Sequence, residues 1–200
     1  NIPTKLAHAS GVAAVFSCFY EFLPLDGGDP LCMWEVEAGK YYELLITTYS
    51  GLYRYNMQDI VRVEGFIGKT PNLIFCGKSG EYLQNGDRKI YGYQFADLFY
   101  QEEKKHGIEF DIMQVVVLEN EFHYVLESKQ QVDYAAIKKE LDDITQREFG
   151  VKSQKMYVMK HTYKNSLFDN LTRDDRGACG IKLPVVLRKI PEQDQIEMTI

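Results

Sequence analysis

The pattern of apolar and polar residues changes character before the middle of the chain. In the first 76 residues, short aromatic and β-branched runs alternate with turn residues, a pattern typical of strands. Gly39-Lys40 is a hairpin signal, and Ser50-Gly51 forms the next turn. The strands that this pattern predicts are Val15–Leu25, Met33–Val36, Tyr41–Tyr49, Leu52–Tyr55, Ile60–Ile67 and Leu73–Cys76.

The later part of the chain mixes helical and strand patterns. Phe95, Leu98 and Phe99 share one helical face that ends at Gly107. A second helix has Asp133 as its N-cap, and its apolar face is formed by Tyr134, Ile137, Leu141 and Ile144. Strands are predicted at Ile112–Leu118, Phe122–Leu126 and Met156–Met159, followed by a polar loop to about Gly180 and the apolar segment Ile181–Leu187.

These patterns predict an α+β protein with two parts. Residues 1–76 form a β-rich part, and residues 87–200 form a small α+β domain with helices packed on a sheet. The polar segment 77–86 holds three glycines, which absorb large backbone changes at little steric cost. We therefore expect the boundary and a hinge there.

Composition narrows the possible classes of partner. A net charge of −6 argues against a general nucleic-acid binder, because phosphate backbones need clustered Lys and Arg. No apolar run approaches the ~20 residues needed to cross a bilayer, and no signal peptide is visible. The chain begins at Asn1 rather than Met, so we expect it to be part of a longer protein.

Neither the cysteines nor the histidines show a metal-site spacing. The four cysteines are far apart, which favours free thiols in a reducing cytoplasm. The four histidines also lack such a spacing, so no metal site is predicted. The run Glu102–Lys105 is interpreted as a solvated helix face.

The stretch Tyr42–Val63 carries the most informative chemistry. A strand leads through Ser50-Gly51 to an aromatic pair around Arg54, and Asp59 follows four residues after Tyr55. An aspartate has two acceptor oxygens that can bind both hydroxyls of a ribose, and a nearby arginine can meet phosphate. The spacing alone favours plainer roles, in which Asp59 caps a turn and Arg54 forms a surface ion pair, because such residues are common in loops.

This stretch resembles the Gretchen Hagen family of acyl acid amido synthetases, which belongs to the adenylate-forming enzyme superfamily. The shared residues are Tyr42–Leu44, Thr47–Tyr49, Gly51–Tyr55, Asp59 and Val61, with Phe19–Pro24 upstream. The resemblance implies that residues 1–76 end a large adenylating domain, and that residues 87–200 form its C-terminal lid. It also implies cofactor binding by Asp59, Arg54, Tyr53 and Lys78, and a hinge at Gly77 and Lys78.

One residue departs from the family pattern. Gln58 stands where the family usually has glycine, immediately before the aspartate. Glutamine takes positive φ less freely than glycine, so the local backbone is expected to differ from that of the family.

The stretch Gly180–Pro184 is similar to the family's C-terminal lysine motif. The resemblance makes Lys182 the catalytic lysine that reaches the reacting carboxylate and the α-phosphate, with Lys189 and Lys160 as competitors. A preorganised ammonium there would stabilise the developing negative charge. The residue pattern also allows a solvated lysine beside a strand.

The activity implied by the resemblance uses ATP and Mg²⁺ to convert a small carboxylic acid to an acyl-adenylate, which an amine, usually an amino acid, then attacks. A phosphate loop and an adenine-binding segment are not found in the sequence, so we expect the isolated chain to be inactive. Two alternatives stay open. One is an acyl-CoA-type ligase, and the other is a non-catalytic ligand- or partner-binding α+β module, which Gln58 favours.

Overall fold

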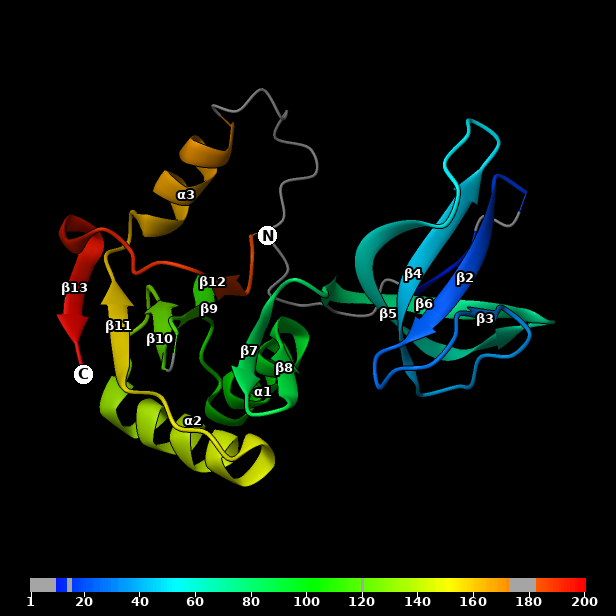
Figure 1. Cartoon of the computed structure of the whole chain (residues 1–200). Coiled ribbons are helices and arrows are strands. Elements are labelled where there is room, and N and C mark those ends of the chain that lie inside the picture. The colour runs from blue at the N-terminus through cyan, green and yellow to red at the C-terminus, as the bar shows by residue number, and fades with distance from the viewer. Residues whose placement is uncertain (1–9, 14–15, 120, 173–182) are drawn as a thin grey trace. The chain divides into compact units, whose positions relative to one another are not determined.

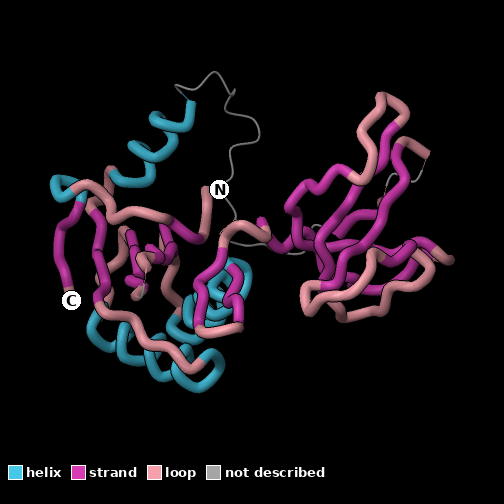
Figure 2. The backbone as a smooth tube through the Cα atoms, in the orientation of Figure 1, coloured by secondary structure: helices cyan, strands magenta, loops and turns pink. Residues whose placement is uncertain are grey.

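The computed structural model describes residues 10–13, 16–119, 121–172 and 183–200. The chain divides into two compact units, Asn1–Gly80 and Glu81–Ile200. The described part of the first unit is built of strands, and the second mixes strands and helices (Figures 1 and 2). The α+β class is therefore confirmed.

The first unit is one six-stranded sheet in the order β1-β6-β5-β4-β2-β3, with antiparallel neighbours. Its core is a cluster of buried apolar side chains that includes Phe22, Tyr42, Val61 and Val63. The strands are β1 (Ser10–Val12), β2 (Cys18–Pro24), β3 (Leu31–Cys32), β4 (Tyr41–Thr48), β5 (Tyr55–Ile67) and β6 (Thr70–Lys78).

Two strands predicted in this unit are wrong. Met33–Val36 starts as a turn, because the Glu35 carboxylate accepts a hydrogen bond from Cys32 N at 2.7 Å and Glu35 N donates to Cys32 O at 2.9 Å. The hairpin predicted around Gly39-Lys40 accordingly has no first strand. Leu52–Arg54 is a loop, and the strand begins only at Tyr55.

The second unit contains a five-stranded mixed sheet in the order β12-β9-β10-β11-β13, together with a separate β7–β8 hairpin. The hairpin strands are β7 (Tyr82–Asn85) and β8 (Arg88–Tyr91). The sheet strands are β9 (Ile112–Val117), β10 (Phe122–Glu127), β11 (Lys155–Met159), β12 (Val186–Leu187) and β13 (Ile196–Thr199), the last preceded by a 3-10 turn at Gln193–Gln195.

Three helices accompany this sheet: α1 (Gly92–His106), α2 (Tyr134–Phe149) and α3 (Tyr163–Thr172). Every residue of β9 and β10 is buried, which requires cover on both faces. Alternate residues of the two strands pack in different clusters. One cluster includes Phe95 of α1 and Leu141 of α2, and the other includes Tyr163 of α3. The sheet is therefore covered on both faces.

The two predicted helices are confirmed, together with their end signals. The Asp133 carboxylate accepts a hydrogen bond from Ala136 N at 3.0 Å, which caps α2. Gly107 ends α1 in the left-handed conformation, with φ of 64°.

The sequence patterns missed other elements of this unit. Strand β7 lies inside the segment predicted as a hinge, β8 follows just after that segment, and α3 begins in the stretch predicted as a loop. The segment after Leu187 adds β13, which pairs with β11.

The interpretation of Glu102–Lys105 as a solvated face is wrong at Glu102. This side chain is buried, with 3% of its surface exposed, because position 102 continues the stripe of Phe95, Leu98 and Phe99 at helical spacing. Burial raises the pKa of its carboxyl group.

Candidate functional site

The loop that joins β4 to β5 is closed by the hydroxyls of two threonines. Thr47 Oγ1 accepts a hydrogen bond from Arg54 N at 3.0 Å, and Thr48 Oγ1 accepts one from Leu52 N at 3.3 Å. Thr48 N also donates to Leu52 O at 2.9 Å. The loop backbone is thereby held, while the Tyr49 and Tyr53 side chains extend into solvent with 96% and 79% of their surface exposed.

Arg54 is held by a buried glutamate. Its Nε and Nη2 atoms donate to the two carboxylate oxygens of Glu21 on β2, at 3.0 and 2.6 Å. This is the planar fork geometry that arginine forms with carboxylates. Only 8% of the Glu21 side chain is exposed, against 50% of the Arg54 side chain, and the pairing raises the pKa of Arg54. In this structure the arginine therefore fixes the loop to the sheet.

Asp59 lies on β5 directly opposite Lys78 on β6. Lys78 Nζ lies 2.5 Å from Asp59 Oδ1, and it also donates to Met57 O at 3.1 Å. The contact with Asp59 is an ion pair without good hydrogen-bond alignment, because Oδ1 has no hydrogen-bond partner within the described residues. The Asp59 side chain keeps 15% of its surface exposed. The fold thus brings together two of the predicted binding residues.

A bulge in β5 sets the position of Asp59. The pairing with β4 shifts between Glu43, which faces Ile60, and Leu45, which faces Asn56, so Met57, Gln58 and Asp59 lie opposite Leu44 alone. Bulges of this kind redirect side chains relative to the regular sheet.

Gln58 adopts the left-handed conformation at the bulge, with φ of 56°. Gln58 N donates to Asn56 Oδ1 at 2.6 Å, and Gln58 O accepts from Ser79 N at 2.8 Å. These bonds hold the glutamine in a conformation that glycine adopts without strain. Gln58 therefore takes positive φ here, and its presence does not prevent the turn that precedes Asp59.

We expect Gln58→Gly to stabilise the protein by about 1 kcal/mol, because it removes the left-handed strain of a residue with a Cβ. Chemical denaturation of the 200-residue chain measures this change. Gln131→Gly is the matched control, since Gln131 is exposed and has no positive φ. The control should be destabilised slightly. A loss of stability in Gln58→Gly equal to that of the control contradicts the prediction.

The residues predicted as the hinge, Gly77 and Lys78, belong to the first unit's sheet. Gly77 and Lys78 end β6, and the Ser79 hydroxyl donates to the Glu43 carboxylate on β4. Two residues later, Glu81 O accepts from Gly92 N at 2.7 Å, and Glu81 Oε2 accepts from Val185 N at 3.0 Å. The hydrogen bonds of Ser79 are therefore made within the first unit, and those of Glu81 within the second. These contacts do not test motion, so a hinge at Gly77 and Lys78 stays a prediction.

Lys182, the predicted catalytic lysine, lies outside the described residues. The segment just after it is anchored, because Pro184 O accepts a hydrogen bond from Gln114 Nε2 at 2.7 Å. Its competitors differ in their contacts. Lys160 Nζ donates to Asp194 O at 2.5 Å, whereas Lys189 is exposed.

The side chains that organise this site were not predicted as site residues. They are Glu21, Glu43, Thr47, Thr48 and Ser79. A signal was available for Glu21, which is a lone acidic residue within an aromatic strand. Its arginine partner lies 33 positions away, so only the strand pairing identifies the contact.

Residues 11–78 match the family model described as the GH3 family central domain. These residues are therefore similar to the central domain of the GH3 family. The similarity to the Gretchen Hagen family predicted from the sequence is thereby confirmed. The matched segment contains the β4–β5 loop, the bulge at Gln58 and the Asp59–Lys78 pair.

The curated proteins that are similar to this segment are plant enzymes. A probable indole-3-acetic acid-amido synthetase of Oryza sativa subsp. japonica is 43% identical over 75 residues, which are 33% of this chain and 12% of that protein. A jasmonoyl–L-amino acid synthetase of Nicotiana attenuata is 39% identical over 73 residues, which are 32% of this chain and 13% of that protein. The matches therefore span about an eighth of each relative.

A solved GH3 structure shares the fold of both units. The structure of a GH3.15 acyl acid amido synthetase covers 95% of this chain, with a TM-score of 0.73 and 18% identity, and the chain covers 39% of that protein. The likeness shows that the two units have the fold of the corresponding part of that protein.

Among the described helices, none combines the length and the apolar composition that a membrane span requires.

Proposed function

We propose that this chain is part of an ATP-dependent acyl acid amido synthetase. The enzyme activates a small carboxylic acid as an acyl-adenylate and transfers the acyl group to an amino acid. The observation that carries the proposal is the match of residues 11–78 to the GH3 family central domain, with Asp59 partly exposed beside Lys78. The names of the relatives support an amide product.

In this proposal Asp59 holds the ribose of ATP. Its carboxylate has acceptor capacity for both ribose hydroxyls, and it remains partly open to solvent. Lys78 neutralises Asp59 before ATP binds and is exposed enough to turn toward a phosphate. The exposed Tyr53 ring contributes an apolar surface to the nucleotide.

Arg54 takes an indirect part in this binding. The bidentate bond to Glu21 occupies its guanidinium, so we assign it to holding the loop that carries Tyr53. ATP enters with its Mg²⁺ as a substrate, and the ion accompanies the phosphates.

We infer that the second unit is the lid of this enzyme and carries Lys182 to the reacting groups. In this proposal residues 1–76 complete the large domain, residues 77–86 are the hinge, and Gly77 and Lys78 change conformation as the lid moves. Ser79 is hydrogen-bonded within the first unit and Glu81 within the second, which supports a hinge close to that segment.

The decisive experiment measures acid-dependent ATP–pyrophosphate exchange by the full-length protein and by the 200-residue chain. We expect exchange by the full-length protein and none by the chain alone, because no phosphate loop is found in its sequence. Absence of ATP binding to the full-length protein would overturn the proposal in favour of a non-catalytic module. Offering amino acids and coenzyme A to the preformed adenylate then distinguishes an amido synthetase from an acyl-CoA-type ligase.

A further inference from the structure

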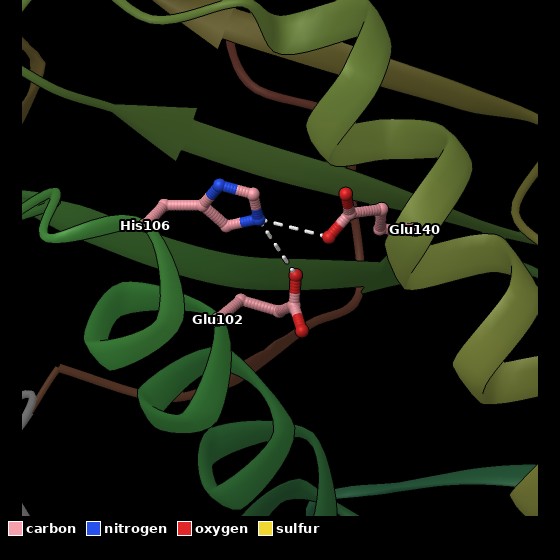
Figure 3. Close-up of side chains that lie close together, drawn as sticks. All are labelled: Glu102, His106 and Glu140. Carbon is pink, nitrogen blue, oxygen red and sulfur yellow. Dashed lines mark hydrogen bonds and ion pairs between the residues drawn. The ribbon is translucent and has the colours of Figure 1, made fainter.

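Three metal-ligating side chains converge between α1 and α2 in the second unit (Figure 3). Glu102 and His106 are one helical turn apart on α1, and Glu140 reaches them from α2. His106 Nε2 lies 2.8 Å from Glu140 Oε2 and 3.4 Å from Glu102 Oε2. One ligand atom from each of the three residues lies within 4.8 Å of the others.

The buried carboxylate of Glu102 provides a second, independent indication of a ligand. Only 3% of this residue is exposed, and Oε2 has no hydrogen-bond partner within the described residues. Figure 3 shows this oxygen directed at the His106 ring. A buried carboxylate oxygen without a hydrogen bond is costly, and coordination to a cation removes that cost.

We propose that Glu102, His106 and Glu140 bind a divalent transition-metal ion of the Zn²⁺ class, which links α1 to α2. An imidazole nitrogen with two carboxylate oxygens is a donor set that Zn²⁺ accepts. Zinc–ligand bonds of about 2.0–2.2 Å place any two donors no more than about 4.4 Å apart. Small side-chain rotations therefore suffice to bring the three atoms around one ion, with a fourth position for water.

Lys105 is the competing cation at this site. Its Nζ lies 2.5 Å from Glu140 Oε2 and 3.9 Å from Glu102 Oε2, and 55% of its side chain is exposed. Without metal, this ammonium compensates the two carboxylates. A bound ion takes over that role, and the lysine turns outward to solvent. We therefore expect that removal of the Lys105 ammonium strengthens metal binding.

The test is calorimetric titration of the metal-free 200-residue chain with ZnCl₂. We expect one saturable site, which Glu102→Gln and His106→Gln each weaken by about 100-fold or more, because loss of outer-shell partners alone costs 10–100-fold. Lys105→Met should bind at least about tenfold more tightly, since a charge that repels the ion is removed. Co²⁺ should give the visible absorption of a site with nitrogen and oxygen ligands.

Glu121→Gln is the matched control. Glu121 also contacts a histidine, His123, at 3.2 Å, but outside this cluster, so its variant should bind zinc as the unmodified chain does. The proposal is overturned by absence of saturable binding, by equal affinity of Glu102→Gln and Glu121→Gln, or by a cobalt–thiolate charge-transfer band. Weaker binding by Lys105→Met would also overturn it, because the lysine would then support the cluster rather than compete with the ion.

Discussion

ATP binds about 100-fold more weakly to Asp59→Ala than to the unmodified full-length protein, if this carboxylate holds the ribose. Hydrogen bonds to a charged group contribute about 1.5–3 kcal/mol each, and a tenfold change in affinity corresponds to about 1.4 kcal/mol. The substitution removes the hydrogen bonds to two ribose hydroxyls. The loss of binding free energy is smaller than their sum, because Asp59 must first be released from its ion pair with Lys78. Calorimetric titration with ATP measures the difference.

Glu64→Gln is the control for this substitution. Glu64 is an exposed carboxylate on the same strand and accepts a hydrogen bond from Asn72 Nδ2 at 3.0 Å. Its variant should keep the affinity for ATP, and both variants should remain folded, because partly exposed ion pairs contribute about 0–1 kcal/mol. Equal ATP affinity of Asp59→Ala and Glu64→Gln would remove Asp59 from the nucleotide site.

Lys182→Ala in the full-length protein is expected to slow adenylation by about 10²–10³-fold. Removing one preorganised donor from a developing negative charge has an effect of this size. ATP–pyrophosphate exchange measures the step directly. ATP affinity should change far less than the rate, since the lysine acts mainly on the transition state.

The two competing lysines, Lys160 and Lys189, provide the controls for Lys182. Lys160 is bonded to Asp194 O, so Lys160→Ala should leave exchange unaffected. Lys189 is exposed, and Lys189→Ala tests whether a different lysine of the same region acts in catalysis. Exchange that is unchanged in Lys182→Ala and abolished in Lys189→Ala would assign the role to Lys189.

Local sequence patterns predicted those helices and strands whose own residues show a clear apolar periodicity or a capping residue. The stripe from Tyr134 to Ile144, with Asp133 as cap, predicted α2 because an amphipathic helix is encoded by residues three and four apart. Strands such as Met156–Met159 and Phe122–Leu126 are likewise mostly apolar. The turn at Met33–Val36 was missed because it depends on one side chain, Glu35, which accepts a hydrogen bond from the backbone amide of Cys32.

For the candidate site, the sequence supplied residue types but not their partners. Asp59 and Lys78 were each singled out, but their ion pair depends on the register of β5 against β6. Arg54 was predicted to bind the cofactor. In the structure its guanidinium is hydrogen-bonded to Glu21, on the strand that pairs with β4. Such pairs are separated along the chain, and no local periodicity encodes the register that joins them.

By itself, the sequence determined that this is an α+β chain with a GH3-like motif, and the ribose-binding role of Asp59 stays a prediction. Tertiary structure alone decided that Gln58 takes positive φ and that Glu140 lies beside Glu102. The physical reason is the range of the interactions. Helix and strand periodicity act over a few residues, whereas burial and charge pairing depend on which distant segments pack together.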